Sequence, residues 1–160
     1  MPIDVATYRK VIGAFATGVT IVTTEVDGRY HGFTANAVAS VSLDPLLLLV
    51  CVDKRAHAHR ELASARSFGV NVLTDRQQEL SNLFATSGEP SAEGLRGVAF
   101  TRGASGAPLI DGALAALECE TYRALDAGDH TIYLGRVVEG AIDTAAAPLL
   151  YYLGGYRRLG

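Results

Sequence analysis

Short runs rich in apolar and β-branched residues, separated by turn-forming residues, recur along the chain and predict β-strands. Residues 19–26 are almost all of this kind, and the Asp27-Gly28 pair that follows is a strong signal for a tight hairpin. A return strand is therefore expected from about residue 30. Comparable runs predict four more strands, at 46–53, 68–74, 113–125 and 130–142.

Three stretches have the spacing of amphipathic helices instead. Asp4 is placed to cap a helix at the start of the chain, and 55–66 reads as a second short helix. Asp75 is expected to cap a third. The segment 87–112, in which Ser, Gly and Pro recur, is expected to form a long and partly ordered loop. The apolar face expected for the third helix consists of Leu80, Leu83 and Phe84.

The order of these elements bears on the fold class. The strands fall into antiparallel-compatible pairs and do not alternate regularly with helices, which favours a barrel or a sandwich. The chain has 160 residues, about half of them apolar, so it has the size of one domain and can bury a substantial core. We therefore predict a single mainly β domain over 1–160 with two or three helices packed outside it.

Composition excludes several classes of partner. The formal net charge is −3 and no segment concentrates Lys and Arg, so nucleic-acid binding is not expected. The longest strongly apolar run, 46–52, is far shorter than the roughly 20 residues of a membrane-spanning helix, and the N-terminus lacks a signal core. Cys51 and Cys119 are expected to be buried free thiols, too few to hold a metal. These features predict a cytoplasmic protein without a metal site.

Several familiar catalytic motifs are absent from the sequence. It contains neither the dinucleotide fingerprint G-x-G-x-x-G nor a P-loop, and neither a G-x-S-x-G nucleophile elbow nor the zinc motif H-E-x-x-H. His57 and His59 would point to different faces of a helix, so joint metal ligation is not expected. We interpret this pair as incidental residues of a solvated helix.

One segment, 32–42 (GFTANAVASVS), is too small-sided to fill a core and too apolar for a solvated loop. Its hydroxyl and amide side chains recur at even spacing and would share one face of a strand. Small side chains let a flat ligand approach the backbone while the polar groups hydrogen-bond its edge. A polar edge strand that faces water explains the pattern equally well. The polar residues concerned are Thr34, Asn36, Ser40 and Ser42.

Two further features lie at the ends of predicted strands. The triplet Asp53-Lys54-Arg55 closes the strand 46–53, where ligand sites often form, and its two cations could meet a phosphate. Downstream, a Gly-Asp turn at 128–129 delivers His130 onto the start of a long strand. Ordinary strand-end charges and an incidental histidine remain the alternative explanations.

Eight segments, taken in order, resemble the short-chain flavin reductases of two-component monooxygenase systems. They cover almost the whole chain, and the agreement of all eight in register carries the resemblance. The segments are FATGVTIVTT (15–24), GFTANAVASVSLDP (32–45), LVCVDK (49–54), FGVNVL (68–73), LSNLFA (80–85), LECETY (117–122), GDHTIYLGRV (128–137) and PLLYYLGGY (148–156).

The resemblance implies a split β-barrel of Greek-key order that forms a homodimer, with FAD or FMN in a groove near the dimer interface. It implies NADH, or NADPH, as the reductant, and a flavin-dependent monooxygenase component as the recipient of the reduced flavin. No catalytic side chain is expected, because hydride passes directly between the two cofactors.

The same resemblance implies which residues contact the cofactors. The family commonly has serine at the position of Ala37, so one hydroxyl donor is missing from this chain. The positions that match flavin contacts are Thr34, Ala35, Asn36, Ala37, Ser40, Val41, Ser42, Cys51, Asp53, Lys54 and Phe84. The positions assigned to the nicotinamide nucleotide are His130, Asp129 and Tyr156.

The chain is therefore expected to be an NAD(P)H:flavin oxidoreductase that supplies diffusible reduced flavin to a partner monooxygenase. Two other functions stay open from the sequence. One is a pyridoxamine-phosphate oxidase-like enzyme with bound FMN, which shares the same barrel. The other is a flavin-binding module without catalytic activity, which would give a flavin spectrum but negligible oxidation of NADH.

Overall fold

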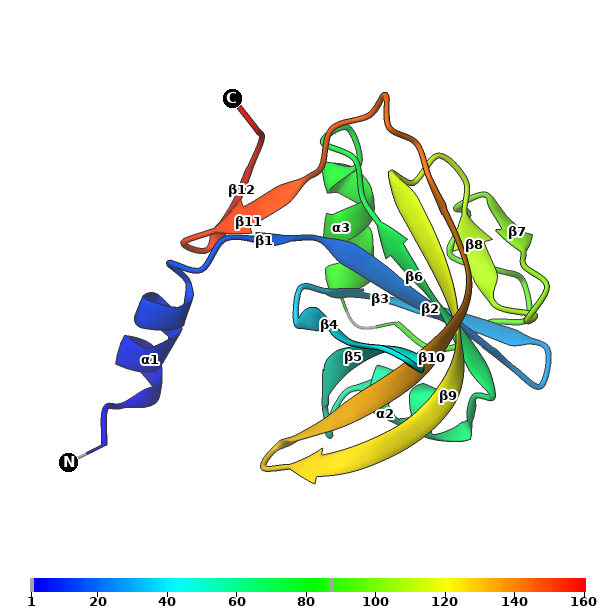
Figure 1. Ribbon diagram of the computed structural model, residues 1–160, viewed down its shortest axis with the longest axis horizontal. Helices are drawn as coiled ribbons and strands as arrows, with labels where there is room; N and C mark the ends of the chain where they lie inside the picture. The colour runs from blue at the N-terminus through cyan, green and yellow to red at the C-terminus, as the bar shows by residue number, and fades with distance from the viewer. Residues whose placement is uncertain (1, 87) are drawn as a thin grey trace.

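The computed structural model describes residues 2–86 and 88–160 (Figure 1). Within them the chain forms one large antiparallel sheet, two small sheets and three short helices. The helices are α1 (Val5–Ile12), α2 (His57–Ser64) and α3 (Gln78–Ala85). The strands of the large sheet are β2 (Thr20–Val26), β3 (Arg29–Ala35), β4 (Val38–Leu43), β5 (Leu46–Asp53), β6 (Ser67–Val72), β9 (Ala115–Ala127) and β10 (His130–Ile142). The small sheets contain β1 (Thr17–Gly18), β11 (Leu150–Tyr152) and β12 (Gly155–Arg157), and β7 (Phe100–Arg102) and β8 (Pro108–Ile110).

The predicted mainly β class and the first hairpin are confirmed. Asp27 and Gly28 have positive φ angles of 52° and 76°, the left-handed conformation that a two-residue hairpin turn requires. Val26 and Arg29 pair across the turn, and the ladder continues along β2 and β3. The β-branched run of β2 is buried through most of its length because β2 lies inside the sheet, between β3 and β6.

The large sheet curls on itself, as its strand order requires. The order is β3-β2-β6-β9-β10-β5-β4, so the edge strands β3 and β4 are consecutive in the chain. Only Asn36 and Ala37 separate them, which forces the two edges of the sheet to be neighbours. The Cys51 N–H donates to the Ala37 carbonyl at 3.0 Å and fastens this link to β5. Among the described residues no ladder joins β3 to β4, so the curl does not close.

Two apolar clusters fill the molecule. The first lies between the curled sheet and α2, which contributes Ala58 and Leu62. Gly135 of β10 packs over the ring of Phe68 there, and a Cβ at this glycine would lie only 2.5 Å from Phe68 Cζ. The second cluster includes Phe84, the buried apolar residue of α3. Helix α3 thus covers the sheet through the face that the sequence predicts to be apolar, and α2 does so through Ala58 and Leu62.

The segment 87–112 is more ordered in its described part than the sequence predicts, because β7 and β8 form a small hairpin within it. Asn71 of β6 holds this hairpin to the large sheet. Its amide donates to the Ile21 carbonyl at 2.9 Å and to Thr23 Oγ1 at 3.1 Å, and its Oδ1 accepts from the Ile110 N–H at 2.9 Å. The buried side chain of Asn71, which is distant in sequence, thus orders a hairpin that the composition of the segment does not predict.

The cap of α1 follows the prediction, whereas that of α3 departs from it. Asp4 Oδ1 accepts from the Thr7 N–H at 2.7 Å, which confirms the cap of α1. The prediction that Asp75 caps α3 is wrong, because a turn intervenes and α3 begins only at Gln78. In that turn Gln77 Oε1 accepts from the Thr74 N–H at 2.9 Å. The side chain of Gln77, the residue before α3, therefore bonds within the turn and does not cap the helix.

Helix α1 projects away from the body of the molecule and buries none of its residues (Figure 1). Its apolar side chains are left open, since Val5 is 67% and Val11 65% exposed. No helix in 2–86 or 88–160 combines the length and the apolar character needed to cross a bilayer.

Candidate functional site

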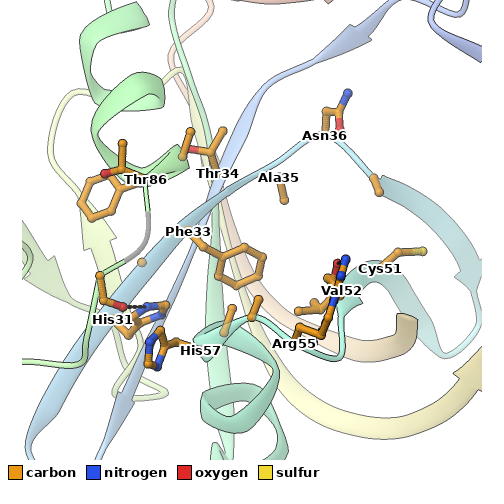
Figure 2. A pocket seen from close by; sticks show the side chains of 18 of the residues that line it. His31, Phe33, Thr34, Ala35, Asn36, Cys51, Val52, Arg55, His57 and Thr86 are labelled. Atoms are coloured by element: carbon orange, nitrogen blue, oxygen red, sulfur yellow. Dashed lines mark hydrogen bonds and ion pairs between the residues drawn. The ribbon is translucent and has the colours of Figure 1, made fainter. Parts of the chain in front are cut away.

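A cavity of about 440 Å³ opens between the end of β3, the end of β5 and the helices α2 and α3 (Figure 2). Its volume lies within the roughly 300–1,000 Å³ typical of small-molecule sites. The cavity exists because the curl of the sheet brings its edge β3 close to β5. Its walls are formed by 31–37, 51–53, 55–58, 84–86, Gly88 and His130.

Small and apolar side chains line the inner part of this cavity. Ala35 and Ala58 are buried in the first apolar cluster, and Phe33 packs against the same cluster. At Gly32 a Cβ would lie 3.0 Å from Cε1 of Phe84, so the glycine lets α3 approach β3 closely. An apolar interior with few protruding side chains suits a flat aromatic ligand.

A cation stands at the mouth of the cavity. The Arg55 side chain is 85% exposed and donates from Nε and Nη2 to the two carboxylate oxygens of Asp53, at 3.2 and 3.0 Å. These bonds, together with that of the Arg55 N–H, lower the pKa of Asp53 to about 2. The pair is therefore ionised at neutral pH, and Asp53 fixes the guanidinium at the cavity edge.

The first turn of α2 adds hydrogen-bond donors beside this guanidinium. Its leading residues, Ala56, His57 and Ala58, line the cavity. No side chain caps the helix. The N–H groups of an uncapped first turn need partners, and the helix dipole favours a negative one. Arg55, His57 and the start of α2 together form a donor set suited to an anion.

His130 occupies another part of the rim. It begins β10 and pairs across the ladder with Asp53. Its Nδ1 lies 2.8 Å from Oδ1 of Asp129, and because a carboxylate only accepts, Nδ1 carries the hydrogen. This contact lowers the pKa of Asp129. Asp129 thus orients the imidazole without itself lining the cavity.

One histidine of α2, His59, has a defined role in packing, which corrects its interpretation as an incidental residue. His59 Nε2 lies 2.8 Å from Thr131 Oγ1, and its ring meets Tyr133 edge-on with the centroids 5.7 Å apart. His57 lies instead on the cavity wall, near His31 (Figure 2). Their side chains point to different places, as predicted, and no cluster of three metal-ligating side chains occurs in the described part of the chain.

The cavity brings together most of the positions that the sequence marked as a cofactor site. They come from β3, the link to β4, β5, α3 and β10, and only the curl of the sheet makes them neighbours. The predicted positions that line it are Thr34, Ala35, Asn36, Ala37, Cys51, Asp53, Phe84 and His130. Thr34 is already engaged, since its hydroxyl donates to the Ser81 carbonyl at 2.7 Å.

Other predicted flavin contacts lie outside this cavity. Ser40, Val41 and Ser42 sit further along β4, and a register shift between Ser40 and Ser42 interrupts the even spacing on which the single polar face depended. Lys54 forms an ion pair with Asp126 and does not reach the wall. Contacts of these four residues with a flavin remain predictions.

Tyr156, predicted to meet the nicotinamide nucleotide, lies in a neighbouring hollow of about 250 Å³. Its hydroxyl is 2.6 Å from Ser81 Oγ, and its ring meets that of Tyr151 edge-on. This hollow shares Thr34, Asn36 and Ala85 with the main cavity, so Tyr156 is adjacent to the site but not part of its wall.

Sequence reasoning missed several residues of the wall. His31 and Phe33 alternate with Ala35 along β3 and share its inward face, a signal that was present in the period of two. Thr86 and Gly88 follow α3, where the amino-acid composition gave no indication of a binding site. Only the tertiary approach of α3 to β3 identifies them.

The chain matches the model of the flavin reductase-like domain over residues 12–160. It is 44% identical over 149 residues to the reductase component of a flavin-dependent trigonelline monooxygenase from Acinetobacter baylyi, covering 92% of this chain and 47% of that protein. It is 42% identical over 160 residues to an NADH-dependent FAD reductase from Streptomyces globisporus, covering 98% of this chain and 87% of the relative. The chain thus spans about half the length of the first relative and most of the second.

Solved structures agree with these sequence matches. The NADH:FAD oxidoreductase of Streptomyces globisporus, in complex with NAD and FAD fragments, superimposes with a TM-score of 0.90 at 40% identity, covering 98% of this chain and 93% of that one. The flavin reductase PheA2 superimposes with a TM-score of 0.89 at 36% identity, covering 99% of both chains.

Proposed function

Because this chain belongs to the flavin reductase-like domain family, we propose that residues 1–160 act as one domain and reduce FAD or FMN at the expense of NADH. The observation that carries the proposal is the cavity itself, a recess whose inner part is lined by small and apolar side chains, with a fixed cation and an uncapped helix at its mouth. The related Streptomyces protein is named an NADH-dependent FAD reductase, which supports NADH as the reductant.

The residues present fit a flavin. The small side chains at Ala35 and Ala37 leave room for a flat ring against the backbone of β3 and the link to β4. Arg55, His57 and the start of α2 would hold a phosphate of the cofactor tail, since all three supply donors at one end of the cavity. Burial raises the pKa of Cys51, so its thiol stays neutral beside the ring.

A bound flavin would accept a hydride from the nicotinamide of NADH, and this chemistry belongs to the cofactors. The chain contributes position. His130, held by Asp129, would orient the nicotinamide nucleotide at the rim and is not required as a general base. The small and apolar side chains of the inner part would help to keep water from the region where the two rings meet.

Replacement of His130 by alanine tests its role in orientation. We expect the KM for NADH to rise about three- to tenfold, the cost of one lost hydrogen bond, with flavin affinity unchanged. Initial rates over a range of NADH concentrations give the KM, and quenching of flavin fluorescence gives the affinity. Unchanged kinetics, or an equal loss of flavin affinity, would remove His130 from this role.

Steady-state oxidation of NADH and NADPH with added FMN, FAD or riboflavin tests the proposed function as a whole. Arg55 is paired with Asp53 and would already hold the phosphate of the flavin, so the 2′-phosphate of NADPH finds little compensation at the mouth. We therefore expect turnover with NADH to exceed turnover with NADPH. Absence of turnover with every pair would overturn the proposal.

We further assign the curled seven-stranded sheet to the split β-barrel of Greek-key order, and the product to a partner monooxygenase. The adjacency of the edge strands β3 and β4 supports the first assignment. Relatives named as reductase components of flavin-dependent monooxygenases support the second. Use of NADH favours the cytoplasm as the location.

A homodimer completes the proposal. The apolar face of α1 contacts no other element of its own chain closely enough to be buried, and Val5, Tyr8 and Val11 are all more than half exposed. A second copy would cover this face. We expect sedimentation velocity to give a dimer for the protein and a shift toward monomer for Val11→Asp, whereas a monomer for the unaltered chain would contradict it.

A further inference from the structure

His31 is a buried histidine on the cavity wall whose hydrogen-bonding state the structure fixes. It lies on the inward face of β3 and is 7% exposed. Its Nε2 lies 3.0 Å from the carbonyl oxygen of Gly88. Because a carbonyl can only accept, Nε2 carries the hydrogen, and in the neutral ring Nδ1 is left with a lone pair.

His31 Nδ1 and Thr24 Oγ1 are both buried and find no hydrogen-bond partner among the described residues. Thr24 and His31 are direct cross-strand partners of β2 and β3, so their side chains lie on the same face of the sheet. The threonine hydroxyl does not reach Nδ1, so among the described residues the Gly88 carbonyl alone sets the tautomer of the neutral ring.

The Gly88 carbonyl belongs to a segment that runs along the start of β3. Tyr30 and Ser91 exchange two backbone hydrogen bonds, at 2.8 and 2.9 Å. Arg29 Nη2 donates to the Pro90 carbonyl at 3.4 Å. Three successive residues of β3 thus hold the segment 88–91, and of these three His31 is the one whose bond reaches the cavity wall.

We propose that His31 is a positioning residue of this site: as the Nε2–H tautomer, it fastens the Gly88 carbonyl to β3 and so shapes the cavity wall beyond α3. The inference rests on the proposed flavin-binding function for its consequence, but not for its geometry. His31 acts through Gly88, which lines the cavity, rather than through contact with reacting atoms.

The surroundings of His31 keep it neutral. Burial lowers its pKa from 6.5, against an opposing contribution from the bond to Gly88. Of the charged groups that face it, Glu61 raises the pKa, whereas His57 and Arg96 lower it. Just below pH 6.5 the unfolded chain therefore binds a proton at His31 that the folded chain does not bind. The resulting stability is complete above pH 6.5 and is lost as the pH falls through the lowered folded-state pKa.

Two substitutions at His31 separate the tether from mere packing. Glutamine carries an amide nitrogen at the position of Nε2 and can still donate to Gly88, whereas phenylalanine keeps a planar ring and cannot. We expect His31→Phe to weaken the binding of FMN about three- to tenfold, and His31→Gln to recover most of that loss. Flavin fluorescence quenching gives the affinities, without any need for turnover.

Amide hydrogen exchange of Ser91 in the ligand-free protein provides a second readout. Its N–H donates to the Tyr30 carbonyl at 2.9 Å, so exchange should accelerate when the neighbouring tether to Gly88 is lost. The expected order is His31→Phe faster than His31→Gln, with the latter near the unaltered protein. The ¹⁵N signals of His31 in the unaltered protein should be those of the Nε2–H tautomer.

The outcomes are distinguishable. Equal FMN affinity and equal Ser91 exchange in His31→Phe and the unaltered protein would overturn the inference, as would a glutamine variant as weak as the phenylalanine one. A His31 ring that carries its hydrogen on Nδ1 would contradict the tether. If the unaltered protein binds no flavin at all, the proposed function fails, yet the exchange and tautomer measurements still decide whether the tether exists.

Discussion

Replacement of Ala37 by tryptophan is expected to abolish flavin binding, with a loss of affinity of about a hundredfold or more, which corresponds to about 2.7 kcal/mol. Ala37 lines the cavity and is exposed, so the indole would enter the space proposed for the flavin without displacing core residues. The backbone carbonyl of Ala37 accepts a hydrogen bond from the Cys51 N–H, and the substitution retains this bond.

The effect is measured by titrating FMN and FAD against the variant and following flavin fluorescence, with NADH oxidation as a second readout. Ala63→Trp is the matched control, because Ala63 is an exposed alanine of α2 outside the cavity. The control should bind flavin normally. Normal binding by Ala37→Trp would mean that the flavin lies elsewhere, and equal loss in both variants would point to a general effect of the added tryptophan.

Replacement of Asn71 by leucine is expected to cost about 2–5 kcal/mol of unfolding free energy. Asn71 is fully buried and its amide makes three hydrogen bonds, to Ile21, Thr23 and Ile110. Leucine has nearly the same shape, so packing is retained while buried donors and acceptors lose their partner. The Ile110 N–H is the group most affected, since it joins the β7–β8 hairpin to the large sheet.

Urea unfolding followed by far-UV circular dichroism gives the difference in stability from the midpoint and the slope. Asn82→Leu serves as the control, because Asn82 is an exposed residue of α3 and should change the unfolding free energy by less than about 0.5 kcal/mol. A midpoint unchanged by Asn71→Leu would show that the network contributes nothing measurable.

Local signals in the sequence predicted the strands and their hairpins well, because turn chemistry and β-branched runs act over a few residues. Asp27-Gly28 fixed the first hairpin, and Asp4 capped α1, through contacts within four residues. The prediction failed where order depends on distant partners. The β7–β8 hairpin is held by Asn71 from β6, and the start of α3 is displaced by the turn at Gln77.

The candidate site shows the same division. Thr34–Ala37, Asp53 and His130 were identified from the sequence, the first two from residue chemistry and position and all of them from family resemblance. The even spacing that joined Ser40 and Ser42 to this set assumed one unbroken strand. The strand is instead interrupted at 36–37, and the register of β4 shifts between Ser40 and Ser42. His31 and Gly88 had no local signal as partners, because 57 residues separate them in the chain.

The central claim is that the cavity between β3, β5, α2 and α3 holds the flavin. A crystal structure of the complex with FMN or FAD tests it most directly. We expect the isoalloxazine ring to lie against Ala35 and Ala37, with the phosphate near Arg55 and the start of α2. Well-defined density for the flavin at any other place on the molecule would contradict it.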